Sequence, residues 1–585
     1  MASGTAADGM VYMLSRTIRR RESGVLQALP GDLHPLLRRL YANRGVNEAG
    51  DLDLGLARLI PVSQLGGIDA AVDLLCEHFR RDTRVVVVGD FDADGATSTA
   101  LVVRQLTRLG FKQVEFLVPN RFQYGYGLTP EIVQLAAQLQ PGLIVTVDNG
   151  ISSHAGVAAA TALGIETLIT DHHLAGASLP AAQAIVNPNS PGETFPSKAL
   201  AGVGVAFYLM AALTRAMQER GLCVTAPPVA ELLDLVALGT IADLVPLDRN
   251  NRILVHQGLR RIRAGRCIAG IRALLEAANC VPANTIASGL GFQIGPRLNA
   301  AGRLDDMSIG IQCLLTDDPH AARLLAARLS QLNTDRKELE LQMQQEALLA
   351  IADMRAEDPQ LPLGLCLFDE SWHQGVVGLV ASRVKERVNR PVIALARSDE
   401  NTLKGSARSI SGVHIRDVLD TLATRHPGLI EKFGGHAMAA GLTLPAAGLE
   451  KFRSEFDAEV RRWMSIEDTL GVVHSDGSLQ QEELTIDVAR LLQQAGPWGQ
   501  AFPEPLFDGC FEVRNVRVLG ERHLKLEVRS ADGPSCEAIA FRHFDHDDAP
   551  EVQPDSRVEL AYRLDVNRFN GSERLQLVVE YLRVL

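Results

Sequence analysis

Residues 85–95 read VVVVGDFDADG, in which four consecutive valines lead directly into three acidic side chains. A run of β-branched residues indicates a buried β-strand. Asp90, Asp92 and Asp94 alternate along the chain, so an extended segment directs them to the same side. Crowded carboxylates repel one another and raise one another's pKa unless a cation offsets the charge. The segment therefore predicts a cation at the carboxyl end of a buried strand.

Two alternatives compete with this prediction. The spacing Asp-x-Asp-x-Asp-Gly matches the first half of a calcium-binding EF-hand loop. That loop needs a preceding helix and a glutamate six positions after its glycine, where this chain has Leu101, so the EF-hand is excluded. The second alternative is an acidic turn exposed to solvent, and it loses support only if partner ligands occur elsewhere in the chain.

Three further apolar segments also end in acidic or imidazole side chains. They read LIVTVDNG at 143–150, TLITDHH at 167–173 and LVALGTIAD at 235–243, and the last also fits a helix. Helix-like stretches at 131–138 and 155–163 alternate with the strands, which indicates a parallel sheet. Because parallel strands end at one edge of a sheet, we expect their terminal side chains to meet the first three acids there. These side chains are Asp148, Asp171, His172, His173 and Asp243.

The types of side chain in this set narrow the choice of metal. Carboxylates with one or two imidazoles suit Mn²⁺ or Mg²⁺, and the absence of cysteine from the motifs argues against structural zinc. Five or six ligands are too many for one ion that keeps open positions. We therefore predict two ions, about 4 Å apart and sharing a carboxylate, an arrangement that supports displacement at phosphorus.

The motifs GDFDADG, VDNG, DHH and LGTIADLVPL together resemble the DHH phosphoesterase superfamily. The segments PRLNAAGR at 296–303, WHQGVVG at 372–378 and GGHAMAAG at 434–441 are similar to those of the RecJ family of single-strand-specific 5′→3′ DNA exonucleases. The resemblance runs from about residue 50 to the C-terminus. In one departure, Val88 stands where many superfamily members carry a histidine, which leaves the role of Asp90 open.

The resemblance implies a role for each residue of the predicted centre. Asp148 is the carboxylate shared by the two ions. His173 is catalytic, like the metal ligands, but faces the substrate phosphate. Asp171 orients its neighbours. For His173 the alternative is a buried histidine that donates to a carbonyl. The implied metal ligands are Asp90, Asp92, Asp94, Asp148, His172 and Asp243. The implied DNA- and phosphate-binding residues are Arg121, Tyr124, Arg297, Asn299, Arg303, Ser406, Arg408, Gly435 and His436.

The resemblance and the element pattern together predict an α/β protein of several domains. We expect a helical N-terminal preface at 1–60, a parallel-sheet DHH catalytic domain at 61–316 and a connecting helix at 317–358. A second, smaller α/β DHH-associated domain follows at 359–465, and an OB-type β-barrel of five strands at 466–585. We expect the connecting helix to bridge two domains. A coiled coil is the alternative, but the apolar positions of this helix do not follow a heptad repeat.

Three features bear on nucleic-acid binding: an aromatic loop, the net charge and two basic segments. The loop RFQYGYG at 121–127 offers Phe122, Tyr124 and Tyr126 for base stacking, although a packed lid would have the same composition. The 585 residues carry 58 basic and 70 acidic side chains, a net charge of −12 that permits a DNA partner without supporting one. Basic segments at 37–39 and 258–263 fit either a DNA channel or a solvated helix face.

The cysteine pattern and the hydropathy of the chain indicate the expected cellular location. The eight cysteines are scattered without a CxxC pair, which is typical of a reduced, cytoplasmic protein. No apolar run is long enough for a bilayer, so we expect no membrane association.

The predicted function, by resemblance, is a Mn²⁺- or Mg²⁺-dependent exonuclease for DNA repair and recombination. It degrades single-stranded DNA 5′→3′ to nucleoside 5′-monophosphates by two-metal hydrolysis, with the strand threaded between the two α/β domains. The expected partners are single-stranded DNA, single-strand binding protein and a helicase, and the expected state is a monomer. An esterase of short oligonucleotides, cyclic dinucleotides or pyrophosphate would not need the barrel, and a non-catalytic scaffold would have lost ligands.

Overall fold

The computed structural model describes residues 16–22, 24–25, 29–120, 127–223, 225, 227–357, 361–465, 467–469, 471–530, 533–545, 549–568 and 572–585. The chain divides into two compact units. Unit 1 contains residues 1–21, 335–489 and 506–585, and unit 2 contains residues 22–334 and 490–505. The loop candidates Arg121, Phe122, Tyr124 and Tyr126 lie outside the described residues. The bounds of the five domains proposed from the sequence stay predictions.

Unit 2 is built around a five-stranded parallel sheet with the strand order β3-β2-β4-β5-β6. The predicted strands are present, and β3 and β6 are two that the motifs did not indicate. Their bounds are β2 Val85–Gly89, β3 Val114–Leu117, β4 Leu143–Val147, β5 Glu166–Thr170 and β6 Ala184–Val186.

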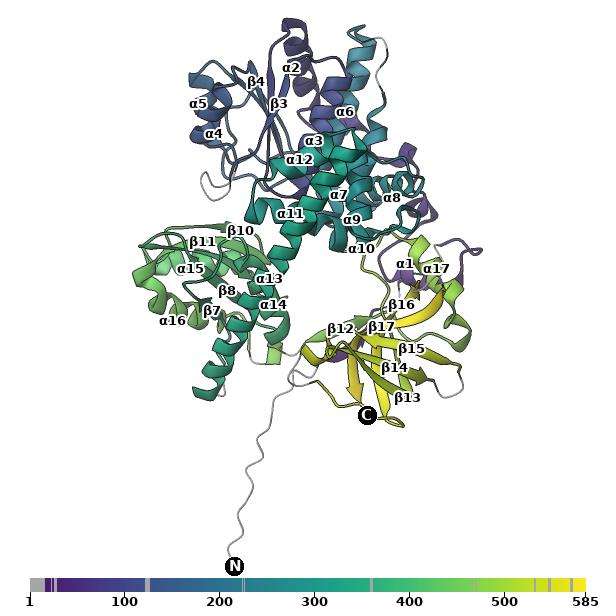
Figure 1. Ribbon diagram of the computed structural model, residues 1–585. Helices are drawn as coiled ribbons and strands as arrows, with labels where there is room; N and C mark the ends of the chain where they lie inside the picture. Colours follow the sequence, from purple (N-terminus) through teal and green to yellow (C-terminus); the bar gives the residue numbers. More distant parts are fainter. Residues whose placement is uncertain are drawn as a thin grey trace, which may run out of the picture. The chain divides into compact units, whose positions relative to one another are not determined.

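Helices cover both faces of this sheet, as the upper part of Figure 1 shows. Alternate residues of the strands, such as Val86, Val88 and Ile144, pack against α4 (Pro130–Ala137) and α5 (His154–Ala162). On the other side, α3 (Ala93–Arg108) contacts β2 and α6 (Gly202–Glu219) contacts β4. Helix α2 (Ile68–Arg81) contacts α6 and β6. Burial of both faces explains why the strands are apolar runs rather than alternating sequences.

A series of helices follows the sheet. The apolar run that ends at Asp243 is helix α7 (Leu233–Ala242), so of the two structures that fit this segment the protein adopts the helix. The remaining members are α8 (Arg249–Arg263), α9 (Ala269–Ala277), α10 (Ala287–Gly289), the π-helix η7 (Leu290–Ile294), α11 (Gly295–Leu304) and α12 (Ser308–Leu315).

The predicted connecting helix is α13 (Pro319–Glu357), a helix of 39 residues. It begins where the Asp318 carboxylate accepts hydrogen bonds from the backbone N–H groups of His320 and Ala321. Such a cap satisfies donors that have no partner within the helix. The helix starts in unit 2 and continues into unit 1.

Unit 1 contains the predicted second α/β domain. Its five-stranded sheet has the order β10-β11-β9-β8-β7, and only the β7–β8 pair is parallel. The elements are β7 (Leu365–Phe368), α14 (Val377–Val388), β8 (Val392–Arg397), β9 (Thr402–Arg408), α15 (Ile415–Arg425), β10 (Lys432–Gly435), β11 (Ala439–Pro445) and α16 (Leu449–Val460).

The predicted five-stranded barrel is also present in unit 1. It closes in the order β13-β14-β15-β17-β16, through a parallel contact between β15 and β17. Its strands are β13 (Phe507–Leu519), β14 (His523–Arg529), β15 (Ser535–Ala540), β16 (Arg557–Asn567) and β17 (Arg574–Val584). The predicted fold class, a parallel-sheet domain, a long helix, a second α/β domain and a barrel, is confirmed.

The N-terminal preface, which the sequence predicted to be helical, also contains a β-strand. Residues Thr17–Arg20 form strand β1, which pairs in parallel with β12 (Val472–Ser475). Arg20 is also held by the carboxylate of Asp508 at 2.7 Å. After this strand come α1 (Pro35–Ala42) and short 3₁₀ turns. The strand could not be recognised from its sequence because its partner lies more than 450 residues away.

In the described part of the chain, no single helix is both long and apolar enough to span a membrane.

Replacement of Arg104 by alanine is expected to destabilise unit 2. This buried guanidinium on α3 donates to the carbonyl oxygens of Leu314, Leu315 and Thr316, at the end of α12, and pairs with Asp317. Its loss leaves carbonyl groups without donors, at a cost of about 2–4 kcal/mol. Thermal unfolding measures the effect. The matched control, Arg215→Ala, removes an exposed guanidinium that pairs with Glu219 on its own helix. Equal melting temperatures for the two variants would contradict the prediction.

Candidate metal centre

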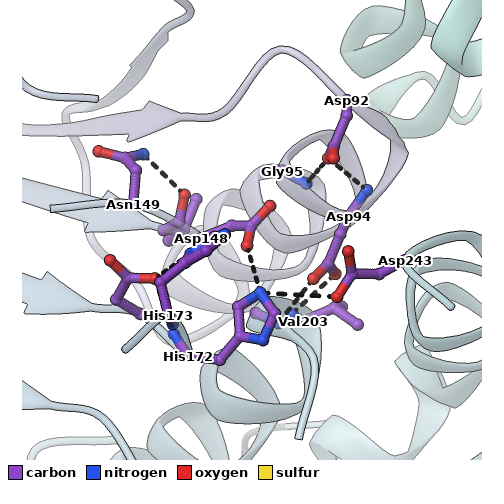
Figure 2. A network of polar contacts seen from close by, with 12 residues as sticks. Asp92, Asp94, Gly95, Asp148, Asn149, His172, His173, Val203 and Asp243 are labelled. Carbon is purple, nitrogen blue, oxygen red and sulfur yellow. Dashed lines mark hydrogen bonds and ion pairs between the residues drawn. The ribbon is translucent and has the colours of Figure 1, made fainter. Parts of the chain in front are cut away.

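The first motif leaves β2 and enters α3 through a tight turn. Asp92 is the N-cap of α3, and its Oδ1 accepts hydrogen bonds from the backbone N–H groups of Asp94 at 2.9 Å and Gly95 at 3.0 Å (Figure 2). A carboxylate is stable at this position because the N-terminus of a helix carries unpaired donors and partial positive charge. The strand-to-helix turn therefore fixes one carboxylate at the sheet edge.

Asp94 occupies a second helix N-terminus. Its two carboxylate oxygens accept hydrogen bonds from the backbone N–H groups of Gly202 at 2.6 Å and Val203 at 3.0 Å, at the start of α6. Burial and the charge of Asp92 raise the pKa of Asp94 to about 7, although the two N–H donors act in the opposite direction. Asp94 thus ties α3 to α6 while it remains beside the other acids.

Asp148 and Asp243 lie on either side of His172 (Figure 2). The His172 Nε2 atom is 3.1 Å from Asp148 Oδ1 and 3.5 Å from Asp243 Oδ2. Burial and the charges of neighbouring acids, Asp94 first, raise the pKa of both carboxyl groups well above the ordinary value. Asp148 adopts a left-handed backbone conformation with φ 61°, which is uncommon for a residue other than glycine. Such backbone strain is often found at functional sites.

The Asp171 carboxylate holds the two histidines that follow it. Its Oδ1 accepts from the backbone N–H groups of His172 at 2.7 Å and His173 at 3.1 Å, and lies 2.7 Å from His173 Nδ1. Its Oδ2 accepts from the N–H of Ile151. Burial lowers the pKa of His173, but the hydrogen bond and charge of Asp171 outweigh it and raise that pKa to about 9. Asp171 therefore holds the backbone of both histidines and the ring of His173.

The side chains converge into three groups, and within each group the ligand atoms all lie within 4.8 Å of one another. One group joins Asp90 and Asp92 to Asp148, and so includes the residue whose role the sequence left open. The others are Asp148 with His172 and His173, and Asp94 with His172 and Asp243. Carboxylate oxygens with few imidazoles are the donors that Mn²⁺ and Mg²⁺ prefer, so the residues fit these ions.

Three glycines that the motifs did not single out make this convergence possible. A Cβ atom on Gly202 would lie 2.6 Å from the Asp148 Cβ, and one on Gly239 would lie 2.8 Å from Asp94 Oδ1. A Cβ on Gly302 would lie 1.8 Å from the carbonyl oxygen of Phe91. Helix interiors disfavour glycine, so Gly239 within α7 and Gly302 within α11 were the signals available in the sequence, whereas Gly202 is the first residue of α6.

Comparison with known proteins agrees with the fold and the centre. Residues 84–240 match the N-terminal domain of the DHH family, residues 362–462 the DHHA1 domain and residues 475–581 the RecJ OB domain. The chain is 54% identical to the single-stranded-DNA-specific exonuclease RecJ of Salmonella typhimurium, over 97% of this chain and 98% of that protein. It is 53% identical to the RecJ exonuclease of Escherichia coli, over 96% of this chain and 98% of the relative.

The chain belongs to the RecJ family. The crystal structure of RecJ in complex with Mn²⁺ from Thermus thermophilus covers 96% of this chain and 79% of its own, with a TM-score of 0.79 and 32% identity. The corresponding complex with Mg²⁺ gives a TM-score of 0.74 at 30% identity, over 96% of this chain and 78% of its own. These RecJ relatives therefore contain the two metals to which the donor set here is suited.

The DNA-binding residues implied by resemblance to RecJ are distributed over both units. In unit 2, Asn299 Oδ1 accepts from the backbone N–H of Ala93 at 2.8 Å and so supports the first motif. Arg297 donates to the carbonyl oxygens of Gln293 and Ala277 and to the hydroxyl of Ser330. Arg303 lies half-buried on the same helix, α11.

In unit 1, Ser406 and Arg408 lie on β9 with both side chains near Gly378. A Cβ on that glycine would lie 2.9 Å from Arg408 Nη2 and 3.2 Å from Ser406 Oγ. Burial lowers the pKa of Arg408. Gly435 ends β10 with φ 149°, and the backbone N–H of His436 donates to the carbonyl oxygen of Ala439. The structure thus brings Ser406 and Arg408 together at the start of α14.

Mn²⁺ is expected to raise the melting temperature of the protein, because cations offset the repulsion among the buried carboxylates. At about 100 times the dissociation constant the gain is about 2.7 kcal/mol, or about 4 °C for a unit of this size. Asp148→Asn is expected to melt no lower than the unaltered protein without metal, and to lose most of the Mn²⁺-dependent rise. Differential scanning fluorimetry with and without MnCl₂ measures the melting temperature and its Mn²⁺-dependent rise.

Asp69→Asn, which changes an exposed acid on α2, is the control that should keep the full rise. An undiminished rise in Asp148→Asn would argue against metal binding at this centre.

Proposed function

We propose that this protein is a metal-dependent exonuclease that degrades single-stranded DNA 5′→3′, releases nucleoside 5′-monophosphates, and serves DNA repair and recombination. The observation that carries the proposal is a complete carboxylate and imidazole centre in a chain that matches single-strand-specific exonucleases over nearly its full length. A relative that had become a scaffold would not need to keep the strained Asp148 or the buried, mutually repelling acids.

Two Mn²⁺ or Mg²⁺ ions are the proposed cofactors. The ligands are Asp92, Asp94, Asp148, His172 and Asp243, with Asp90 as a further carboxylate on the Asp92 side. Asp148 is the proposed shared ligand, and its membership of two of the three ligand groups supports this assignment. When bound, a pair of such ions activates water for attack at phosphorus and offsets the charge on the departing oxygen.

Other residues of the centre act on the substrate or hold the ligands in place. We assign His173 to the substrate phosphate, since Asp171 fixes its Nδ1 and thereby directs the opposite nitrogen, Nε2, away from the Asp171 carboxylate. Asp171 and Asn299 hold the motif backbones, at His172 and His173 and at Ala93. Preorganised groups of this kind lower the barrier because they need not move during the reaction.

The second α/β domain is the proposed site for the 5′ end of the strand. The Ser406 hydroxyl, the Arg408 guanidinium and the backbone at Gly435 and His436 offer donors that suit a terminal phosphate. Arg297 and Arg303 in unit 2, with Arg121 and Tyr124, are assigned to the remainder of the strand.

Beyond DNA, the proposed partners are single-strand binding protein and a helicase, and the proposed state is a monomer. We also propose a cytoplasmic location, in keeping with eight cysteines that are all free.

Asp148→Ala is expected to abolish Mn²⁺- and Mg²⁺-dependent nuclease activity while circular dichroism shows an unchanged fold. End-labelled single-stranded DNA, duplex DNA and a dinucleotide, digested in Mn²⁺, reveal which substrate disappears and from which end. Loss of single-stranded DNA from the 5′ end, with mononucleotide products, is the expected result, and Asp69→Ala should match the unaltered protein. Preferential loss of the dinucleotide would identify a small-oligonucleotide esterase instead. A fully active Asp148→Ala enzyme would refute the assignment of the centre.

Arg408→Gln is expected to weaken the preference for a 5′-phosphorylated end. Loss of a hydrogen bond to a charged group costs about 1.5–3 kcal/mol, or about 10- to 100-fold in the ratio of kcat/KM for phosphorylated over hydroxyl ends. Arg453→Gln is the control, because Arg453 lies on α16 and pairs with Glu450 on the same helix. An unchanged ratio in Arg408→Gln would show that this guanidinium does not read the terminal phosphate.

A further inference from the structure

Residues 490–505 belong to unit 2, although the residues on both sides of them belong to unit 1. After α17 (Ile486–Ala495), the chain makes a tight turn in which Gly499 and Phe502 exchange backbone hydrogen bonds of 2.9 and 3.1 Å. Ala501, inside this turn, has a left-handed backbone with φ 58°. We call residues 498–502 the Trp498 turn.

Three aromatic rings anchor the Trp498 turn to unit 2. Trp498 stacks on Phe502 at 5.3 Å between ring centroids, and Tyr41 of α1 stacks on both rings at 6.0 and 6.3 Å. The guanidinium of Arg44 lies 5.1 Å from the centre of the Trp498 ring, and that of Arg252 lies 4.4 Å from the centre of the Phe502 ring. Stacked aromatic rings and cation–π contacts are worth more than the area they bury.

Polar contacts make this anchor specific. The Trp498 indole N–H donates to the carbonyl oxygen of Leu492 at 2.9 Å, and the Tyr41 hydroxyl donates to that of Ala495 at 2.8 Å. Arg44 Nε donates to the carbonyl oxygen of Pro503 at 2.7 Å. The turn is therefore held from both ends as a rigid element.

The tip of the Trp498 turn touches the chain on both sides of Asp243. The Gln500 carbonyl accepts a hydrogen bond of 2.8 Å from the backbone N–H of Leu247, four residues after Asp243. At Gly499, a Cβ would lie 2.7 Å from Leu247 Cδ1 and 3.9 Å from the Cδ1 of Ile241, two residues before Asp243.

The segment that follows Asp243 needs such support. Leu244, directly after it, has a left-handed backbone with φ 61° and is 68% exposed, so its own side chain contributes little packing. Further support comes from the Asn251 side chain, which donates to the carbonyl oxygen of Pro246. Gly295 also lies against Ala242, the residue before Asp243.

We propose that the Trp498 turn is a positioning element for Asp243, and that it sets the affinity of the centre for Mn²⁺ or Mg²⁺ without touching DNA. The proposal rests on the proposed role of Asp243 as a metal ligand. Gly499, Gln500 and the three stacked rings act through Leu247 and Ile241, and none of them is a ligand. A shift of the segment 241–247 would move the Asp243 carboxylate away from His172, which it now approaches to 3.5 Å.

Two variants test the proposal. Phe502→Ala removes one ring of the stack, and Gly499→Ala adds one methyl group against Leu247 while it keeps the whole stack. Both are expected to weaken Mn²⁺ binding about 10-fold, the lower end of what loss of groups that orient metal ligands costs. The measurement is calorimetric titration with MnCl₂ alone, without DNA.

Kinetics separate positioning from other roles. We expect the Mn²⁺ concentration for half-maximal activity to rise by the same factor in both variants, with kcat at saturating Mn²⁺ and KM for single-stranded DNA nearly unchanged. Trp498→Phe retains a stacked ring but loses the indole N–H donor to Leu492, so its loss of Mn²⁺ affinity is expected to be smaller than that of Phe502→Ala. Trp463→Ala, which removes an indole on the surface of unit 1, is the matched control.

The outcomes distinguish this proposal from the one on which it rests. If Asp243→Asn binds Mn²⁺ normally, the ligand assignment itself is wrong. If Asp243→Asn loses affinity but Gly499→Ala does not, only the positioning role is refuted. A lower melting temperature with unchanged Mn²⁺ affinity would make the turn purely structural, and a raised KM for DNA alone would make it a substrate contact.

Discussion

Electrostatic repulsion among buried carboxylates is the constraint on which the arrangement of unit 2 depends. Asp94, Asp148 and Asp243 are brought together at one edge of a parallel sheet, where burial and then the charge of Asp94 raise the pKa of the other two. The chain offsets part of this cost with its own dipoles. Asp92 caps the N-terminus of α3, and Asp94 accepts hydrogen bonds from the first N–H groups of α6, so the backbone donors of two helices point at the acids. The negative charge that these dipoles do not offset favours the binding of cations.

Because the carboxylates must lie close together, the backbones of the surrounding helices also approach the centre closely. Gly202 and Gly239 allow α6 and α7 to lie against Asp148 and Asp94, and Gly302 allows α11 to lie against the turn at Phe91. Any larger side chain at these positions would push a helix outward and with it a carboxylate or its donor. In this domain the positions of the carboxylates therefore depend directly on how closely the helices pack. The parallel topology brings the carboxylates together because three strands, β2, β4 and β5, end at one edge of the sheet.

Much of the fold and most of the centre could be predicted because the information lies in short, contiguous motifs. Apolar runs that end in acids identified β2, β4, β5 and α7, and their order gave the sheet and the convergence of side chains. The strands of the barrel followed from alternation and turn residues. What escaped prediction depends on contacts between distant segments. The pairing of β1 with β12, the donors at Gly202 and Val203, and the return of residues 490–505 to unit 2 leave no local pattern.

In the proposed centre, Asp90 supplies a carboxylate in place of the imidazole that many superfamily members carry at the position of Val88, and this difference affects metal preference. Val88, at the position where many superfamily members carry histidine, is fully buried in the apolar core beneath α4 and α5. Asp90 instead joins Asp92 and Asp148 in a group that contains only carboxylates. Relative to a centre with histidine in that place, this group has one more oxygen donor, one more negative charge and one fewer nitrogen. Oxygen-only, anionic sites select hard cations such as Mg²⁺ and Mn²⁺ over metals that favour imidazole. In the proposed centre, the Asp90 side is therefore the harder of the two halves, while His172 gives the side with Asp94 and Asp243 a mixed donor set.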